Sequence, residues 1–157
     1  MSYDNSNNLV ETFFVAGLTN ATVSGVANIR VPTHKGVRFA AIEDIKALVG
    51  ATSIANTTTP VQIQIGTAVT PGKFAGQPVG NAPAGLATGQ TWSVADVDGR
   101  VAAYNPASGV GKGCIDLGAG GDGDSGAAIR DLRVSTLVGT GGTAAGAFSG
   151  WITVRWF

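Results

Sequence analysis

The residues whose types and spacing could support catalysis lie in a glycine-rich stretch, Gly121-Asp122-Gly123-Asp124-Ser125-Gly126. A serine on a tight glycine turn can act as a nucleophile only if a general base lies within hydrogen-bond reach of its hydroxyl. His34 is the only histidine of the chain, so it is the only imidazole available for that role. A third, orienting carboxylate would have to come from Glu43, Asp44, Asp96 or Asp98.

The Gly-Asp-Ser-Gly segment resembles the nucleophile loop of chymotrypsin-like serine proteases, some of which are single-domain viral capsid proteases. This resemblance implies Ser125 as nucleophile and His34 as base, in the chain order of that family. The surroundings depart from the family pattern. His34 lacks the preceding Thr-Ala-Ala, and Gly126 is followed by two alanines where Gly-Pro is usual. We therefore expect no catalytic residue and interpret this segment as a turn between strands, with a viral serine protease as an alternative function.

The same stretch raises the question of a metal ion. Asp122 and Asp124 could offer oxygen ligands to Ca²⁺, but a Ca²⁺ loop ordinarily needs more carboxylates than two. The chain has one cysteine, Cys114, which excludes an intrachain disulfide and a cysteine-based metal site and is typical of a small buried side chain. We expect no metal and no cofactor.

Composition limits the partners. The 157 residues carry 10 Lys and Arg against 10 Asp and Glu, a net charge of zero, and only 13% of them are charged. No long-range field would attract nucleic acid or an anionic membrane, and a surface with so little charge does not oppose self-association. No apolar run approaches the ~18 residues of a membrane span, and residues 1–8 lack the basic start and apolar core of a signal peptide. We expect synthesis in the cytosol, no nucleic-acid or membrane partner, and a role within an assembly.

Short alternating segments between 24 glycines predict a mainly β fold, an antiparallel barrel or sandwich. Residues 39–49 place apolar side chains at three- and four-residue steps, so we predict one short helix there, ended by Gly50. Asp98-Gly99 predicts a hairpin between strands at 91–97 and 100–104. The other predicted strands are 9–16, 21–31, 61–65, 113–117, 127–138 and 151–156.

The two ends of the chain are candidates for contacts with a partner. Residues 1–8 are polar and rich in Asn, which predicts an N-terminal arm attached to a single β domain at 9–157. The strand at 151–156 is too apolar to remain an open edge, so we expect it to be paired within the domain or with a neighbouring subunit. Large aromatic side chains dominate protein interfaces. The predicted interface residues are Phe13, Phe14, Trp151, Trp156 and Phe157.

The segment from about residue 60 to 135 resembles the head decoration (capsid cement) proteins of tailed bacteriophages. The similarity lies in an Asp-Gly-Arg turn at 98–100, glycine and aspartate turns, and short apolar strands. The segments that carry it are 89–101, 102–106, 111–117, 120–124 and 129–132. The resemblance implies a β-barrel-like or β-tulip domain that forms homotrimers on the capsid surface of the virion. It implies the major capsid protein as the partner. The predicted helix and the aromatic C-terminus are not part of the family's pattern.

A third function class remains open beside the decoration protein and the protease. Sandwich domains often serve as carbohydrate-binding or fibre-type modules, which expose aromatic rings in a groove. Trp92, Tyr104 and Trp151 are the candidates for such rings. Their alternative interpretation is as core and interface residues.

Overall fold

A computed structural model describes residues 9–19, 25–33, 36–50, 61–78, 91–93, 114–137 and 147–157. Within these residues the chain forms β-strands and one short 3₁₀ turn, which confirms the predicted mainly β class. The elements are β1 (Leu9–Thr19), β2 (Gly25–Arg30), β3 (Phe39–Val49), β4 (Gln62–Gly66), β5 (Ala75–Pro78), β6 (Thr91–Ser93), β7 (Ile115–Asp116), η1 (Asp124–Gly126), β8 (Asp131–Leu137) and β9 (Ala147–Trp156).

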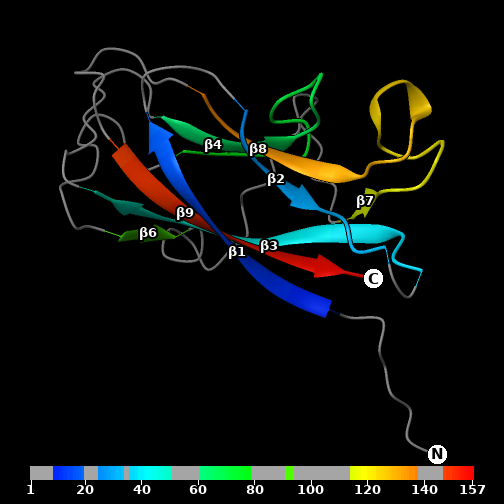
Figure 1. Ribbon diagram of the computed structural model, residues 1–157, viewed down its shortest axis with the longest axis horizontal. Helices are drawn as coiled ribbons and strands as arrows, with labels where there is room; N and C mark the ends of the chain where they lie inside the picture. Colours follow the sequence, from blue (N-terminus) through cyan, green and yellow to red (C-terminus); the bar gives the residue numbers. More distant parts are fainter. Residues whose placement is uncertain are drawn as a thin grey trace, which may run out of the picture.

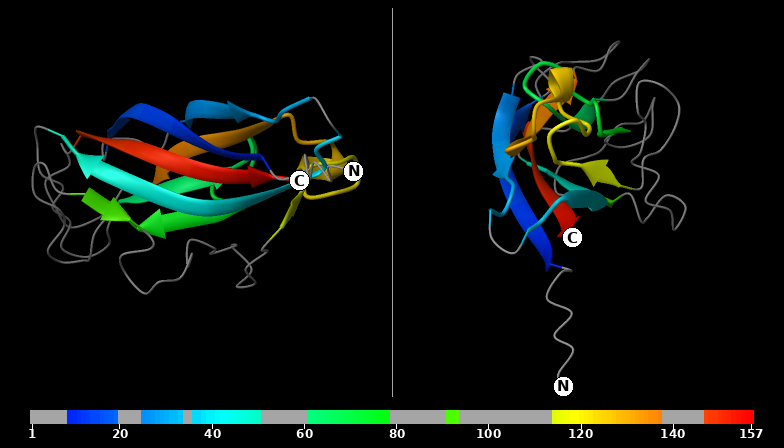
Figure 2. Two further views of the ribbon diagram at one scale, coloured as in Figure 1. Left: turned by 90° about the horizontal axis from the view of Figure 1, so that it is seen from below. Right: turned by 90° about the vertical axis from the view of Figure 1, so that its right-hand side faces the viewer.

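The strands form two antiparallel sheets stacked as a sandwich (Figure 1). Sheet A has the order β1-β9-β3-β6, with β7 also paired to β3, and sheet B has the order β2-β8-β4-β5. Figure 2 shows β3, β9 and β1 running side by side along the length of the molecule. No strand pairing joins the two sheets in the described part of the chain, so the fold there is a sandwich and not a closed barrel.

The last strand is paired on both sides, as expected for a segment too apolar for an open edge. β9 lies between β1 and β3, with Phe14 opposite Trp151 on one side and Lys46 opposite Trp151 on the other. From the sequence we expected the strand at 151–156 to pair either within the domain or with a neighbouring subunit. The structure assigns it to the domain itself.

The predicted helix at 39–49 is wrong, because these residues form β3, a strand within sheet A. The pairing of β3 with β9 shifts register between Ile42 and Asp44, which marks a β-bulge. The bulge converts the two-residue step of buried positions into a three-residue step from Ile42 to Ile45, and this spacing imitates a helical face. Gly50 ends no helix; its N–H donates to the Ala147 carbonyl at 2.8 Å and extends the pairing with β9.

The core lies between the two sheets and follows the alternation of the strands. On β9 every second residue from Phe148 to Trp156 is buried, and the residues between them face outward. Gly150 marks a close approach of the sheets: a Cβ atom there would lie 3.1 Å from Leu18 Cδ1 of sheet A and 3.5 Å from Ile63 Cδ1 of sheet B. A Cβ atom at this position would require the Leu18 side chain to shift by a few tenths of an ångström.

Several predictions lie outside the described residues. They are the arm at 1–8, His34, the Asp98-Gly99 hairpin with most of its strands, and Tyr104. Of the predicted strand at 91–97, residues 91–93 are described, and they form β6 against β3. No helix within the described part of the chain is long and apolar enough to span a membrane.

Candidate functional site

Ser125 lies in η1, on the surface, at the end of the sandwich where β7 and the start of β8 meet. Its φ of 55° is the one positive value among the described non-glycine residues. The neighbouring Asp124 carboxylate is engaged in the loop: its Oδ1 accepts hydrogen bonds from Thr70 Oγ1 at 3.1 Å and Lys73 Nζ at 3.3 Å. The serine is therefore held on a turn that Asp124 fastens to the loop after β4.

These contacts also affect the protonation of Asp124. A hydrogen bond from Thr67 is the largest cause that lowers the pKa of this carboxyl below its usual value. Burial, the second largest, raises the pKa, and Lys73 and Thr70 lower it further. A carboxylate stabilised in its charged form in this way fastens the loop best when it is ionised. The contacts of Asp124 with Thr70 and Lys73 therefore explain its place in the loop without a catalytic role.

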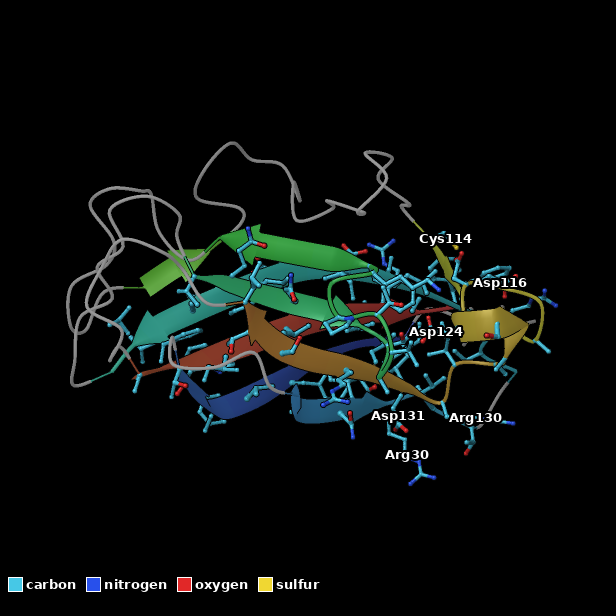
Figure 3. All side chains as sticks on the ribbon, turned by 90° about the horizontal axis from the view of Figure 1, so that it is seen from above. Arg30, Cys114, Asp116, Asp124, Arg130 and Asp131 are labelled. Carbon is cyan, nitrogen blue, oxygen red and sulfur yellow. The ribbon has the colours of Figure 1, made fainter. Side chains whose placement is uncertain are left out.

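Asp122, the other candidate Ca²⁺ ligand, closes the same loop from within. Its Oδ2 accepts the backbone N–H of Asp116 at 2.8 Å, and its own N–H donates to the Asp116 carbonyl at 2.8 Å. Among the residues that the structure describes, no three His, Cys, Asp or Glu side chains gather where they could hold a metal ion. Figure 3 shows Asp116 and Asp124 beside this loop.

The outward surface of sheet A carries a second group of candidate residues, which we call the aromatic face: Val10, Thr12, Phe14, Trp151 and Thr153. These side chains share one face because β1 and β9 pair with Thr12 opposite Thr153 and Phe14 opposite Trp151. The rings of Phe14 and Trp151 are 5.2 Å apart at 48°, and the Thr12 and Thr153 hydroxyls are hydrogen-bonded at 2.9 Å. Phe14 is 59% exposed and Val10 53%, and Thr12 lies between them on the same face of β1.

A shallow pocket adjoins the aromatic face. It has a volume of about 380 Å³ and is lined by Thr12, Asp44, Lys46, Trp151 and Thr153. One indole and several hydrogen-bonding groups thus surround a single hollow on the outside of the sheet. Asp44 and Lys46 line this pocket because they are alternate residues of strand β3 and face outward. The predicted helix at 39–49 did not place them there.

The edge of sheet A lies beside this face. β1 pairs with β9 and with no other strand of the described chain, so in that part of the structure it is an edge strand of sheet A. Natural edge strands are often protected by lysine, proline or inward-pointing charge. The sequence of β1 contains neither lysine nor proline. Its one charged residue, Glu11, accepts the Trp156 indole N–H, and a β-bulge lies between Val15 and Leu18. The edge is therefore protected in part, and the stretch from Leu9 to Phe14 is the part suited to contact with another chain.

The structure separates the five predicted interface residues. Phe14 and Trp151 lie together on the surface, whereas Phe13, on the opposite face of β1, packs against the core and meets the Trp156 ring edge-on at 6.4 Å. Phe157 is partly exposed and packs on Phe39, with ring centres 5.8 Å apart.

Trp156 is the correction in this set, because it is fully buried and belongs to the core rather than to an interface. Its Nε1 donates to Glu11 Oε2 at 2.8 Å, which satisfies the indole inside the sandwich. An alternating strand places Trp151 and Trp156, five residues apart, on opposite faces. The sequence pattern alone does not say which of the two faces is inside.

No protein-family model matches the sequence, and no curated protein matches it. Among solved structures, the chain is similar to a chain of the cyanophage Pam1 capsid asymmetric unit, with 13% sequence identity and a TM-score of 0.43. The match covers 99% of this chain and 90% of that one. A similarity of this degree carries no argument about function.

Proposed function

We propose that this chain is a structural protein of a bacteriophage virion, a decoration protein that binds the outer surface of the head and stabilises it. The observation that carries the proposal is the aromatic face beside the β1 edge of sheet A. The sequence resemblance to capsid cement proteins supplies the class of assembly. In this proposal the partner is the major capsid protein, and the decoration protein acts as a homotrimer.

The exposed apolar side chains give the face its binding energy. Removing a whole phenylalanine side chain from water is worth about 1.5–3 kcal/mol, and Phe14 keeps 59% of its surface exposed in the domain. Burying this exposed part of the Phe14 side chain against a partner would contribute about 1–2 kcal/mol to the free energy of binding. One contact of this size gives only weak affinity. Several copies of the face linked in one oligomer bind together, and the overall affinity then rises steeply.

Catalysis has no part in the proposal. Ser125 serves as a turn residue, and the Asp124 carboxylate fastens the loop through Thr70 and Lys73. A surface assembly protein needs such a loop to be rigid, and the network of hydrogen bonds supports that role.

The test is binding of the purified protein to heads that lack it. Phe14→Ser should weaken binding by about 30-fold, because loss of about 2 kcal/mol is expected for a central aromatic contact. Val69→Ser is the matched control: this residue is 77% exposed but lies on the loop after β4, away from the aromatic face. Unchanged binding of Phe14→Ser, or an equal loss with Val69→Ser, would remove the aromatic face from the docking surface.

The pocket beside Trp151 favours one second candidate, a glycan-binding module. An indole that stacks on a sugar ring, with threonine, lysine and aspartate at the rim, is a suitable arrangement for sugar hydroxyls. Glycan-array binding that disappears in Trp151→Ala, together with normal occupancy of heads by Phe14→Ser, would favour this function over the first.

A further inference from the structure

A larger cleft lies at the end of the sandwich that carries the Gly/Asp loop, and it takes no part in the aromatic face. Its volume is about 590 Å³. Three arginines line it, Arg30 from the end of β2, Arg38 just before β3, and Arg130 just before β8. The chain contains only 10 Lys and Arg in total, so this is a marked concentration of positive charge on a neutral protein.

Two of these guanidinium groups have no acidic partner in the described part of the chain. Arg38 is paired, with its Nη2 at 3.1 Å from Asp116 Oδ2. Arg30 and Arg130 form no ion pair with any described residue, although Asp131 stands opposite Arg30 in the register of β2 and β8. Figure 3 shows both arginines extending away from the ribbon at this end of the molecule. Among the described residues, no carboxylate would have to be displaced from either group before an anion binds.

Backbone hydrogen bonds hold the three arginine-bearing segments together. The Val31 N–H donates to the Arg130 carbonyl at 2.9 Å, and the Leu117 N–H donates to the Arg38 carbonyl at 2.8 Å. The Ile129 N–H then donates to the Leu117 carbonyl at 2.8 Å, which connects the two pairs. The backbone segments that carry the arginines are therefore held together before any ligand arrives, although the exposed Arg30 and Arg130 side chains must still be ordered on binding.

The wall of the cleft is partly apolar. The half-buried side chains of Pro32, Val37 and Ala128 supply its apolar part, and the core residues Leu117 and Ile129 lie beneath them. A bare phosphate would use the arginines and leave this wall uncovered. A peptide that alternates acidic and apolar side chains would use both, since guanidinium groups match carboxylates through paired hydrogen bonds.

We propose that this cleft binds an acidic peptide segment of a protein partner, with Arg30 and Arg130 holding its carboxylates. The complementarity of charge selects this occupant, and the zero net charge of the protein argues against nucleic acid, which is attracted by an extended positive field. The inference does not depend on the virion role, because the partner is defined by its chemistry alone.

Fluorescence polarisation tests the proposal with the full chain and a short labelled peptide of alternating Glu and Leu. The double variant Arg30→Gln/Arg130→Gln should weaken binding at least about tenfold. Arg133→Gln, on β8 but outside the cleft, is the matched control and should leave the affinity within about twofold. Thermal melts of both variants check that they fold, which is expected because Arg30 and Arg130 are exposed.

Two competitors and a mapping experiment complete the test. A Gln and Leu peptide and a short single-stranded oligonucleotide should each compete poorly with the acidic peptide, and NMR shifts on binding should appear at the amides of Gly36 and Gly118, which line the cleft. The proposal is overturned if the acidic peptide does not bind at about 1 mM. Equal binding by the double variant, or stronger competition by the oligonucleotide, overturns it as well.

Discussion

Trp151 and Trp156 offer a comparison in which the same substitution on the same strand should have different effects. Trp156 is 0% exposed, packs against Phe13 and donates its indole N–H to Glu11. Trp156→Ala opens a large cavity and removes the partner of that carboxylate, so it should lower the free energy of unfolding by about 3–5 kcal/mol. Trp151→Ala should lower it by about 2 kcal/mol, because the indole is only partly buried and also loses its ring contact with Phe14.

Urea titration followed by far-UV circular dichroism measures both values without relying on tryptophan fluorescence. With a slope of about 2 kcal/mol per M, the midpoint should fall by about 2 M for Trp156→Ala and by about 1 M for Trp151→Ala. Similar losses in the two variants would refute the assignment of β9's inner and outer faces. A loss in Trp156→Ala below about 1 kcal/mol would refute it too.

Three further predictions concern the loop and the arm. Asp124→Asn should make the free energy of unfolding less sensitive to acid. The pKa of Asp124 is lowered in the folded state, so its carboxylate stabilises the fold above about pH 4, the pKa of an unfolded Asp, and this stabilisation is lost as the pH falls through the folded-state pKa. Urea titrations across that range check it. Ser125→Ala should change stability by less than about 0.5 kcal/mol, and a fluorophosphonate probe should not label Ser125; labelling that His34→Ala abolishes would support the protease. Deleting residues 1–8 should weaken binding to heads while circular dichroism stays unchanged, and unchanged affinity would leave the arm without that role.

The strand content of this fold is readable from the sequence, and the helix error has a definite cause. The alternation at 151–156 and the adjacent phenylalanines of β1 correctly predict strands with two different faces. Between Ile42 and Ile45, however, a single extra residue shifts the pattern by one position. Pairing with β9 determines that bulge, and a distant strand is not visible in a local pattern.

The candidate surfaces were predictable only in part for a similar reason. The sequence places Phe14 and Trp151 among interface residues, but their contact depends on the register of β1 and β9. The cleft was not predictable, because Arg30, Arg38 and Arg130 are scattered along the chain and meet only through backbone pairing at one end of the sandwich. Side chains that are far apart in the sequence are brought together by the pairing of distant strands, which their spacing along the chain does not reveal.

The most direct test of the proposed function is a thermal melt of bacteriophage heads that lack the protein, with and without the purified chain bound. A protein that binds only the mature lattice stabilises it by mass action, so saturating occupancy should raise the melting temperature of the heads, and Phe14→Ser at the same concentration should raise it less. Equal melting temperatures at saturating occupancy of the heads would contradict the stabilising role.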